Sequence, residues 1–237
     1  MGTTSAQAAT AKTISFTAEV WADNWFALYV NGKKVAEDSV SITTQKSFNS
    51  EVIKFSATYP LTIGFIAKDY VQSKSGLEYL GQPNQQIGDG GIIFQIKESV
   101  SGKLVTVSDE TWKMRVANTA PLNPECEKSN QPDLDCKFSN FTIPTNWASA
   151  SFSDKLWASA KVFSATQVGP KDGYLQITWN AAAKFIWGND LKLDNTVYFR
   201  KKVSAPVANS VTASFDFTVT SATGSNLNID KIGRAHV

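Results

Sequence analysis

The sequence predicts an all-β protein with a jelly-roll β-sandwich, and three observations support this. Apolar and polar residues alternate in many short runs, which is the pattern of half-buried strands. Turn residues such as Gly, Pro and Asn separate these runs at the intervals typical of sandwiches and barrels. No stretch combines a sustained helical period with helix caps. With 237 residues, 42% of them hydrophobic, the chain can fill the core of one large β domain.

The first two strands and the turn after them are the clearest local features. Residues 13–20 alternate strictly, and the apolar side chains on one face are Ile14, Phe16, Ala18 and Val20. The second expected strand, residues 25–30, runs into Asn31-Gly32, a strong signal for a two-residue hairpin. We expect residues 33–36 to return from this tip, and the core-facing side chains before it to be Phe26, Leu28 and Val30.

Further strands are expected at residues 51–55, 61–67, 91–97, 104–107, 174–179, 184–187, 197–203 and 211–219. Between them, residues 117–155 are rich in Pro, Asn and Ser and are interpreted as a long surface excursion. The expected organisation is a disordered N-terminus at 1–11, a sandwich at 12–170 with a disulfide loop at 117–150, and further strands at 171–231. Those strands either begin a second similar domain, or residues 197–203 supply a last strand to the first sandwich.

The two cysteines, Cys126 and Cys136, lie in a polar stretch rich in Pro, Asn and Asp. Buried free cysteines usually lie in apolar runs, so we expect a disulfide that closes a short surface loop. The alternatives are two unrelated thiols or a metal site, which the absence of a nearby histidine disfavours. Asn140-Phe-Thr142 is a glycosylation sequon just beyond this loop. These features favour an extracellular or cell-surface protein, although residues 1–11 lack the apolar stretch of a signal peptide.

Charge and hydropathy exclude two classes of partner. The chain has 23 basic and 21 acidic residues, a net charge of +2 and no basic stripe, which argues against nucleic acid. No apolar window approaches the ~18 residues of a transmembrane helix, so membrane insertion is not expected.

The last six residues, 232–237, read Ile-Gly-Arg-Ala-His-Val. They can be encoded by ATCGGAAGAGCACACGTC, which is the core of a widely used short-read sequencing adapter. We therefore interpret them as an artefact in an environmental or transcript sequence, with downstream domains in the full-length protein. His236, the only histidine, would then not belong to the protein.

Three motifs in order resemble the galactose-binding-like jelly-roll domains that accompany bacterial rhamnosidases and β-galactosidases. The first is Trp21-Ala-Asp-Asn-Trp-Phe-Ala-Leu-Tyr-Val-Asn-Gly-Lys33, which is similar to their Leu-Tyr-Val-Asn-Gly hairpin. The second, Val107-Ser-Asp-Glu-Thr-Trp-Lys113, is similar to a late strand of such domains. The third, Phe152-Ser-Asp-Lys-Leu-Trp-Ala-Ser-Ala160, is similar to their closing motif, with Ser153 where the family usually has Asp. The resemblance covers about residues 12–165 and implies an accessory domain.

Enzyme chemistry has little support in the sequence. A nucleophile–base arrangement usually needs a histidine, and no zinc-ligand set or phosphate-binding glycine loop is present. Paired carboxylates for glycoside cleavage remain open, and the acids to check are Asp69, Asp89 and Asp154, which we interpret as solvated turn residues. No cofactor is expected, and no motif supports a structural calcium ion.

Binding is the better-supported activity, because sugar sites stack an aromatic ring on the sugar and surround it with amides and carboxylates. The candidate ligand-binding residues are Trp21, Asp23, Asn24, Trp25, Asp69, Tyr70 and Tyr79. The remaining tryptophans expected in the core are Trp112, Trp157, Trp179 and Trp187. The preferred function is a non-catalytic carbohydrate-binding or accessory module, whose partner is a carbohydrate or cell-surface polysaccharide. The alternatives are a structural or adhesive surface repeat without a small ligand, and the N-terminal accessory part of a truncated glycoside hydrolase.

Overall fold

The computed structural model describes residues 12–42 and 49–206. The chain divides into two compact units, residues 1–205 and 206–237, and every described residue except Pro206 belongs to the first. The expectations for the N-terminus at 1–11, for the strand at 211–219 and for residues 232–237 lie outside the described residues.

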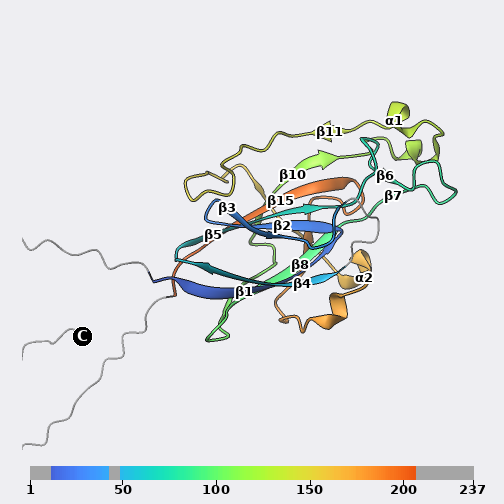
Figure 1. The fold of residues 1–237 in the computed structure, drawn as a ribbon. Helices are drawn as coiled ribbons and strands as arrows, with labels where there is room; N and C mark the ends of the chain where they lie inside the picture. Colours follow the sequence, from blue (N-terminus) through green and yellow to red (C-terminus); the bar gives the residue numbers. More distant parts are fainter. Residues whose placement is uncertain (1–11, 43–48, 207–237) are drawn as a thin grey trace, which may run out of the picture. The chain divides into compact units, whose positions relative to one another are not determined.

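The first unit is all-β and consists mainly of two antiparallel sheets that face each other (Figure 1). In one sheet, sheet A, the strand order is β13 (Lys161–Phe163), β14 (Phe185–Trp187), β8 (Gly91–Glu98), β1 (Ile14–Asp23) and β4 (Ser50–Ala57), with β9 (Leu104–Val107) paired to β8. In sheet B the order is β11 (Ser139–Asn140), β10 (Lys113–Thr119), β15 (Asp194–Val203), β5 (Leu61–Lys68), β2 (Trp25–Val30) and β3 (Lys33–Glu37), with β12 (Ala158–Ser159) paired to β10. The predicted β-sandwich class is therefore confirmed.

The remaining elements are short. A two-stranded hairpin joins β6 (Leu77–Glu78) to β7 (Gln86–Ile87). The helical turns are η1 (Pro124–Lys128), α1 (Pro132–Asp135), α2 (Ala165–Val168) and η2 (Tyr174–Gln176). In Figure 1 the β6–β7 hairpin and both α-helices lie at the right-hand end of the sandwich.

The core between the sheets confirms the alternation expected for the first strands. Phe26, Leu28 and Val30 are buried in it, and the turn after them has positive φ at Asn31 (51°) and Gly32 (84°). These dihedrals suit a two-residue hairpin, whose tip needs left-handed backbone. Aromatic rings from different strands fill the centre: Phe94 stacks on Phe65 at 4.2 Å between centroids and meets the edge of Trp112 at 4.7 Å.

Two expectations for the C-terminal part change. Strand β15 pairs with both β5 and β10, so the first sandwich extends to Val203 rather than ending at residue 170. The strand expected at residues 174–179 was wrong, because the structure has the single-turn helix η2 there. Tyr174 and Trp179, the aromatic residues of this segment, pack beside Trp21 on the outer face of sheet A. Their apolar character therefore reflects partial burial against the sheet and does not indicate a strand.

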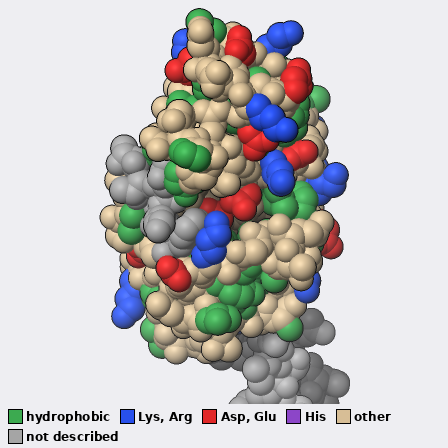
Figure 2. Space-filling model, turned by 90° about the vertical axis from the view of Figure 1, so that its right-hand side faces the viewer, with side chains coloured by type: hydrophobic (Ala, Val, Ile, Leu, Met, Phe, Trp, Pro, Cys, Tyr) green, Lys and Arg blue, Asp and Glu red, His purple; other side chains and the backbone are tan. Residues whose placement is uncertain are grey.

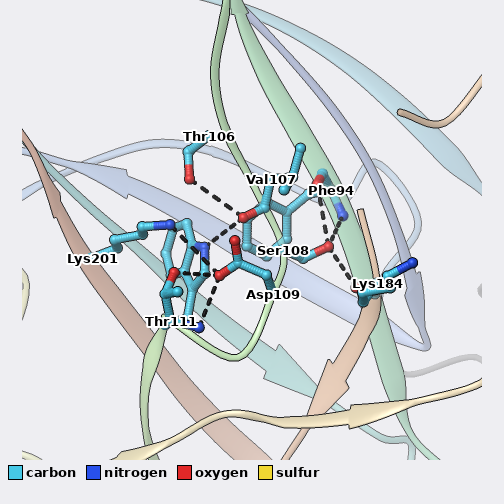
Figure 3. Close-up of polar contacts among 9 residues, drawn as sticks. Phe94, Thr106, Val107, Ser108, Asp109, Thr111, Lys184 and Lys201 are labelled. Carbon is cyan, nitrogen blue, oxygen red and sulfur yellow. Dashed lines mark hydrogen bonds and ion pairs between the residues drawn. The ribbon is translucent and has the colours of Figure 1, made fainter. Parts of the chain in front are cut away.

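The Ser-Asp-x-x-Trp motif is a tightly bonded turn between β9 and β10 (Figure 3). The Ser108 hydroxyl donates a 2.6 Å hydrogen bond to the carbonyl of Lys184, which ties the turn to β14. Asp109 Oδ1 accepts the backbone N–H two residues further on at 2.9 Å, and Trp112 Nε1 donates to the carbonyl of Val107 at 2.7 Å. The Ser, Asp and Trp of the motif therefore each have a structural role in this turn.

The expected disulfide between Cys126 and Cys136 is confirmed, with a Cα–Cα distance of 5.3 Å. Both cysteines are buried against Leu77 of β6, so the cystine fixes the excursion to the β6–β7 hairpin. Three of the four tryptophans expected in the core are buried, Trp112, Trp157 and Trp187, whereas Trp179 is half-buried.

Candidate functional site

Polar residues from three strand ends meet at the end of the sandwich that carries the β6–β7 hairpin. Asp23 ends β1 and pairs in register with Gly91 of β8. The next residue, Asn24, donates its backbone N–H to the carbonyl of Lys68, the last residue of β5, at 2.9 Å. Its side chain accepts the backbone N–H of Tyr70 at 2.5 Å. The corner between β1 and β2 is thereby attached to the segment that follows β5, which begins with Asp69.

Asp23 and Asp69 are buried carboxylates without hydrogen bonds. Their exposed fractions are 1% and 3%, and none of their four carboxylate oxygens accepts a hydrogen bond within the described part of the chain. The Asp69 carboxylate lies against Gly88, where any side chain would collide with Oδ2. A buried carboxylate without a partner is costly, so this pair calls for a physical explanation.

The electrostatics of this end are strongly acidic. Burial and, after it, the negative charge of Asp89 raise the pKa of Asp23 from 3.8 to about 8. Burial also raises the pKa of Asp69 well above its usual range, followed by the charges of Asp23, Glu78 and Asp89. Lys171 lowers the pKa of Asp23, with its Nζ 3.8 Å from Asp23 Oδ2 and 4.0 Å from Asp89 Oδ1.

Figure 2 views the molecule from this end and shows acidic side chains near the middle of the face, with basic side chains beside them. Glu78 belongs to this group through the β6–β7 hairpin, where Gln86 donates to its carboxylate at 3.0 Å. Burial raises the pKa of Glu78 as well. We call Asp23, Asp69, Glu78 and Asp89 the carboxylate cluster.

A polar pocket of about 410 Å³ lies next to the hairpin, between residues 81–85 and the disulfide loop. Gln85 holds its two walls together. The amide nitrogen of Gln85 donates to the carbonyls of Glu127 (2.7 Å) and Ser129 (3.0 Å), and its oxygen accepts the N–H of Gly81 at 2.9 Å. The side chains that line the pocket are Gln82, Pro83, Gln85, Glu127, Lys128, Ser129 and Asn130, together with the backbone of Gly81.

The structure brings four of the seven candidate ligand-binding residues together: Asp23, Asn24, Asp69 and Tyr70 are joined by the contacts described above. Tyr70 is half-buried. Tyr79 is also half-buried and stands at the start of the pocket loop, where its carbonyl accepts the N–H of Gln82 at 2.9 Å.

The two candidate tryptophans do not join them. Trp21 is fully buried, donates from Nε1 to the carbonyl of Asp172 at 2.9 Å, and packs edge-on against Phe185, so it offers no ring face to a ligand. Trp25 belongs to an aromatic cluster on sheet B, and the ammonium of Lys68 lies 5.1 Å from its ring centroid.

The interpretation of three acids as solvated turn residues needs correction. Asp69 is buried because it directly follows a strand whose residues are nearly all buried. Asp154 forms an ion pair with the buried Arg200 and is three-quarters shielded from solvent. Asp89 alone is about half exposed. Glu78, Lys171 and the pocket residues were not predicted, because short segments hold them next to residues that are far away in the sequence.

In the described part of the chain, no group of three or more His, Cys, Asp or Glu side chains is arranged to hold a metal ion. No helix in the same residues is long and apolar enough to cross a membrane.

Comparison of the chain with protein-family models, with curated proteins and with solved structures found no match, so no family is assigned.

Proposed function

We propose that this protein is a non-catalytic carbohydrate-binding or accessory module of a secreted or cell-surface protein, with a jelly-roll sandwich of the galactose-binding-like type. The observation that carries the proposal is the polar pocket between residues 81–85 and the disulfide loop. Its volume of about 410 Å³ is within the usual range of small-ligand sites.

The lining of the pocket suits a ligand rich in hydroxyl groups. Gln82, Lys128 and Asn130 are exposed, and no hydrogen bond within the described residues engages their side chains. Amides both donate and accept hydrogen bonds, as sugar hydroxyls do.

The pocket supports binding better than glycoside cleavage. Cleavage by the common mechanisms needs two carboxyl groups on opposite sides of the scissile bond. The lining includes one, Glu127, and its Oε1 already accepts the N–H of Ile87 at 3.1 Å. The cystine and the exposed Asn140 of the sequon support an oxidising, extracellular setting.

A glycan array tests the proposal. The wild-type chain and the double variant Gln82→Ala/Asn130→Ala are compared with Asn146→Ala, which removes an exposed amide in a different loop. We expect the wild type and the Asn146 variant to bind the same glycans, and the double variant to lose them. If the wild type retains no glycan, the carbohydrate proposal fails, and a surface repeat without a small ligand is favoured.

A further inference from the structure

We propose that Asp23 and Asp69 bind a calcium ion at the end of the sandwich. This site lies outside the lining of the polar pocket, and the inference does not depend on whether that pocket binds carbohydrate.

The first argument is geometric. Both carboxylates are at least 97% buried, and all four of their oxygens lack hydrogen bonds within the described residues. Their backbone positions are fixed, since Asn24 is bonded to β5 and Asp69 donates its N–H to the carbonyl of Asn195 at 3.0 Å. The backbone that carries the two carboxylates therefore cannot move toward solvent without breaking the sandwich corner. Oxygens that are fixed, buried and unpaired are suited to an ion that coordinates them.

The second argument is the local charge. The carboxylate cluster has four acidic groups, and the charges acting on Asp23 and Asp69 include a single cation, Lys171. That ammonium is about half exposed and 3.8 Å from Asp23, beyond hydrogen-bond distance. Among the described residues, one lysine faces four acidic groups, so a divalent ion between the two buried carboxylates would neutralise the charge that Lys171 leaves uncompensated.

The donor atoms favour calcium over other metals. The available ligands are carboxylate, amide and carbonyl oxygens, which suit hard cations, and the described residues offer no histidine or free cysteine nearby. Among these residues no three acids are arranged to hold an ion alone, so amide or carbonyl oxygens and water must complete its shell. Asn195 Oδ1 is a further buried oxygen without a hydrogen bond, on the strand beside Asp69. Calcium accepts such mixed and irregular shells, whereas magnesium requires near-ideal octahedral geometry.

The test uses the 237-residue chain after treatment with EDTA. Terbium(III), a luminescent substitute for calcium, is titrated first, because Tyr70 adjoins Asp69 and can sensitise its emission. We expect emission that added CaCl₂ displaces, and heat of calcium binding by calorimetry. At about 100 times the Kd, calcium should make folding about 100-fold more favourable and raise the Tm by about 5 to 10 °C.

Three variants locate the ion. Asp69→Asn and Asp23→Asn should each weaken calcium binding by about tenfold or more, because each removes a charged ligand. The control Asp133→Asn makes the same change of charge at an exposed position and should bind like the wild type. In EDTA, Asp69→Asn should be at least as stable as the wild type, because it removes a buried charge.

Several results would overturn the inference. These are no terbium emission and no heat of calcium binding at millimolar concentration, equal or tighter binding of MgCl₂, or unchanged calcium binding in Asp69→Asn. A loss of stability of Asp69→Asn in EDTA would also count against it, because the carboxylate would then have a partner within the chain. Repeating the glycan array in EDTA separates the two proposals, because glycan binding and calcium binding are read independently.

Discussion

The buried guanidinium of Arg200 forms an ion pair with Asp154, which is 46 residues earlier in the chain. Arg200 lies on β15 in the middle of sheet B and is fully shielded from solvent. It also donates from Nε to the carbonyl of Trp147 at 2.9 Å and from Nη2 to that of Ser149 at 2.7 Å. One side chain therefore fixes the part of the excursion that covers the outer face of sheet B. The closing Phe-Ser-Asp motif that contains Asp154 has a structural role in this contact.

Removing Asp154 should destabilise the fold strongly. Asp154→Ala leaves the Arg200 charge buried and unpaired, which typically costs about 3 to 5 kcal/mol. The measurement is the free energy of unfolding from urea denaturation. The matched control is Asp109→Ala, which breaks the more exposed ion pair with Lys201 (3.6 Å) and the turn at Thr111. Its cost should be about 1 to 2 kcal/mol. If both variants lower the free energy of unfolding by the same amount, the contact of Arg200 with Asp154 is not what fixes the excursion to sheet B.

Loss of the disulfide should affect both stability and the polar pocket. The double variant Cys126→Ser/Cys136→Ser opens a loop with a sequence separation of 10, for which chain entropy predicts about 3 kcal/mol of destabilisation. The wall that Gln85 attaches belongs to the same loop, so glycan binding should weaken more than the loss of folded protein explains. Urea denaturation and the glycan array measure the two effects. Pocket binding that survives at full strength would show that the cystine does not order the pocket.

Local patterns predicted the sandwich class because alternation and turn residues report directly on nearest neighbours. The Asn31-Gly32 hairpin joins two neighbouring strands, and the alternation from Ile14 to Val20 shows which face of β1 is buried, although its partner strands are distant in the sequence. The position of β15 was left open, because its partners, β5 and β10, are distant in the sequence. The sequence of a strand does not by itself indicate which strands it pairs with.

The candidate site was predictable only in part, for the same reason. Asp23, Asn24 and Asp69 stand out because they end apolar strands, and strand ends gather at the edges of a sandwich. Trp21 was misplaced because its outer face is covered by Tyr174 and Phe185, about 150 residues later. No residue near Trp21 in the sequence indicates that Tyr174 and Phe185 cover it.

Asp38 should make stability depend on pH. The side chain is 5% exposed, Oδ1 accepts the N–H of Val40 at 2.9 Å, and Oδ2 has no hydrogen bond within the described residues. Burial raises the pKa of Asp38 from 3.8 to about 6. Because the folded pKa is the higher one, the stabilising contribution of the protonated form is complete below pH 3.8 and is lost as the pH rises through 6.

The variant Asp38→Asn isolates this contribution. Its free energy of unfolding should match the wild type near pH 4 and exceed it by about 2 kcal/mol at pH 7, after allowance for partial solvation. Urea denaturation at several pH values in EDTA measures the difference, and EDTA removes any effect of bound calcium. A difference that does not change between pH 4 and 7 would show that Asp38 titrates normally.

Gly64 should be the least replaceable position in β5, because the ring of Trp147 lies directly on it. A Cβ at Gly64 would stand 2.5 Å from Cζ3 and 2.7 Å from Cη2 of that ring. Gly64→Ala should therefore force Trp147 off the outer face of sheet B and cost about 1 to 3 kcal/mol, the usual range for overpacking. The free energy of unfolding and the near-ultraviolet circular dichroism of the displaced indole measure this.

Gly64→Ala combined with Trp147→Leu tests the cause, because the smaller side chain leaves room for the methyl group. Adding Gly64→Ala should then cost less in the Trp147→Leu background than in the wild type; an equal cost in both would place the collision elsewhere, at the Phe199 carbonyl 3.3 Å away.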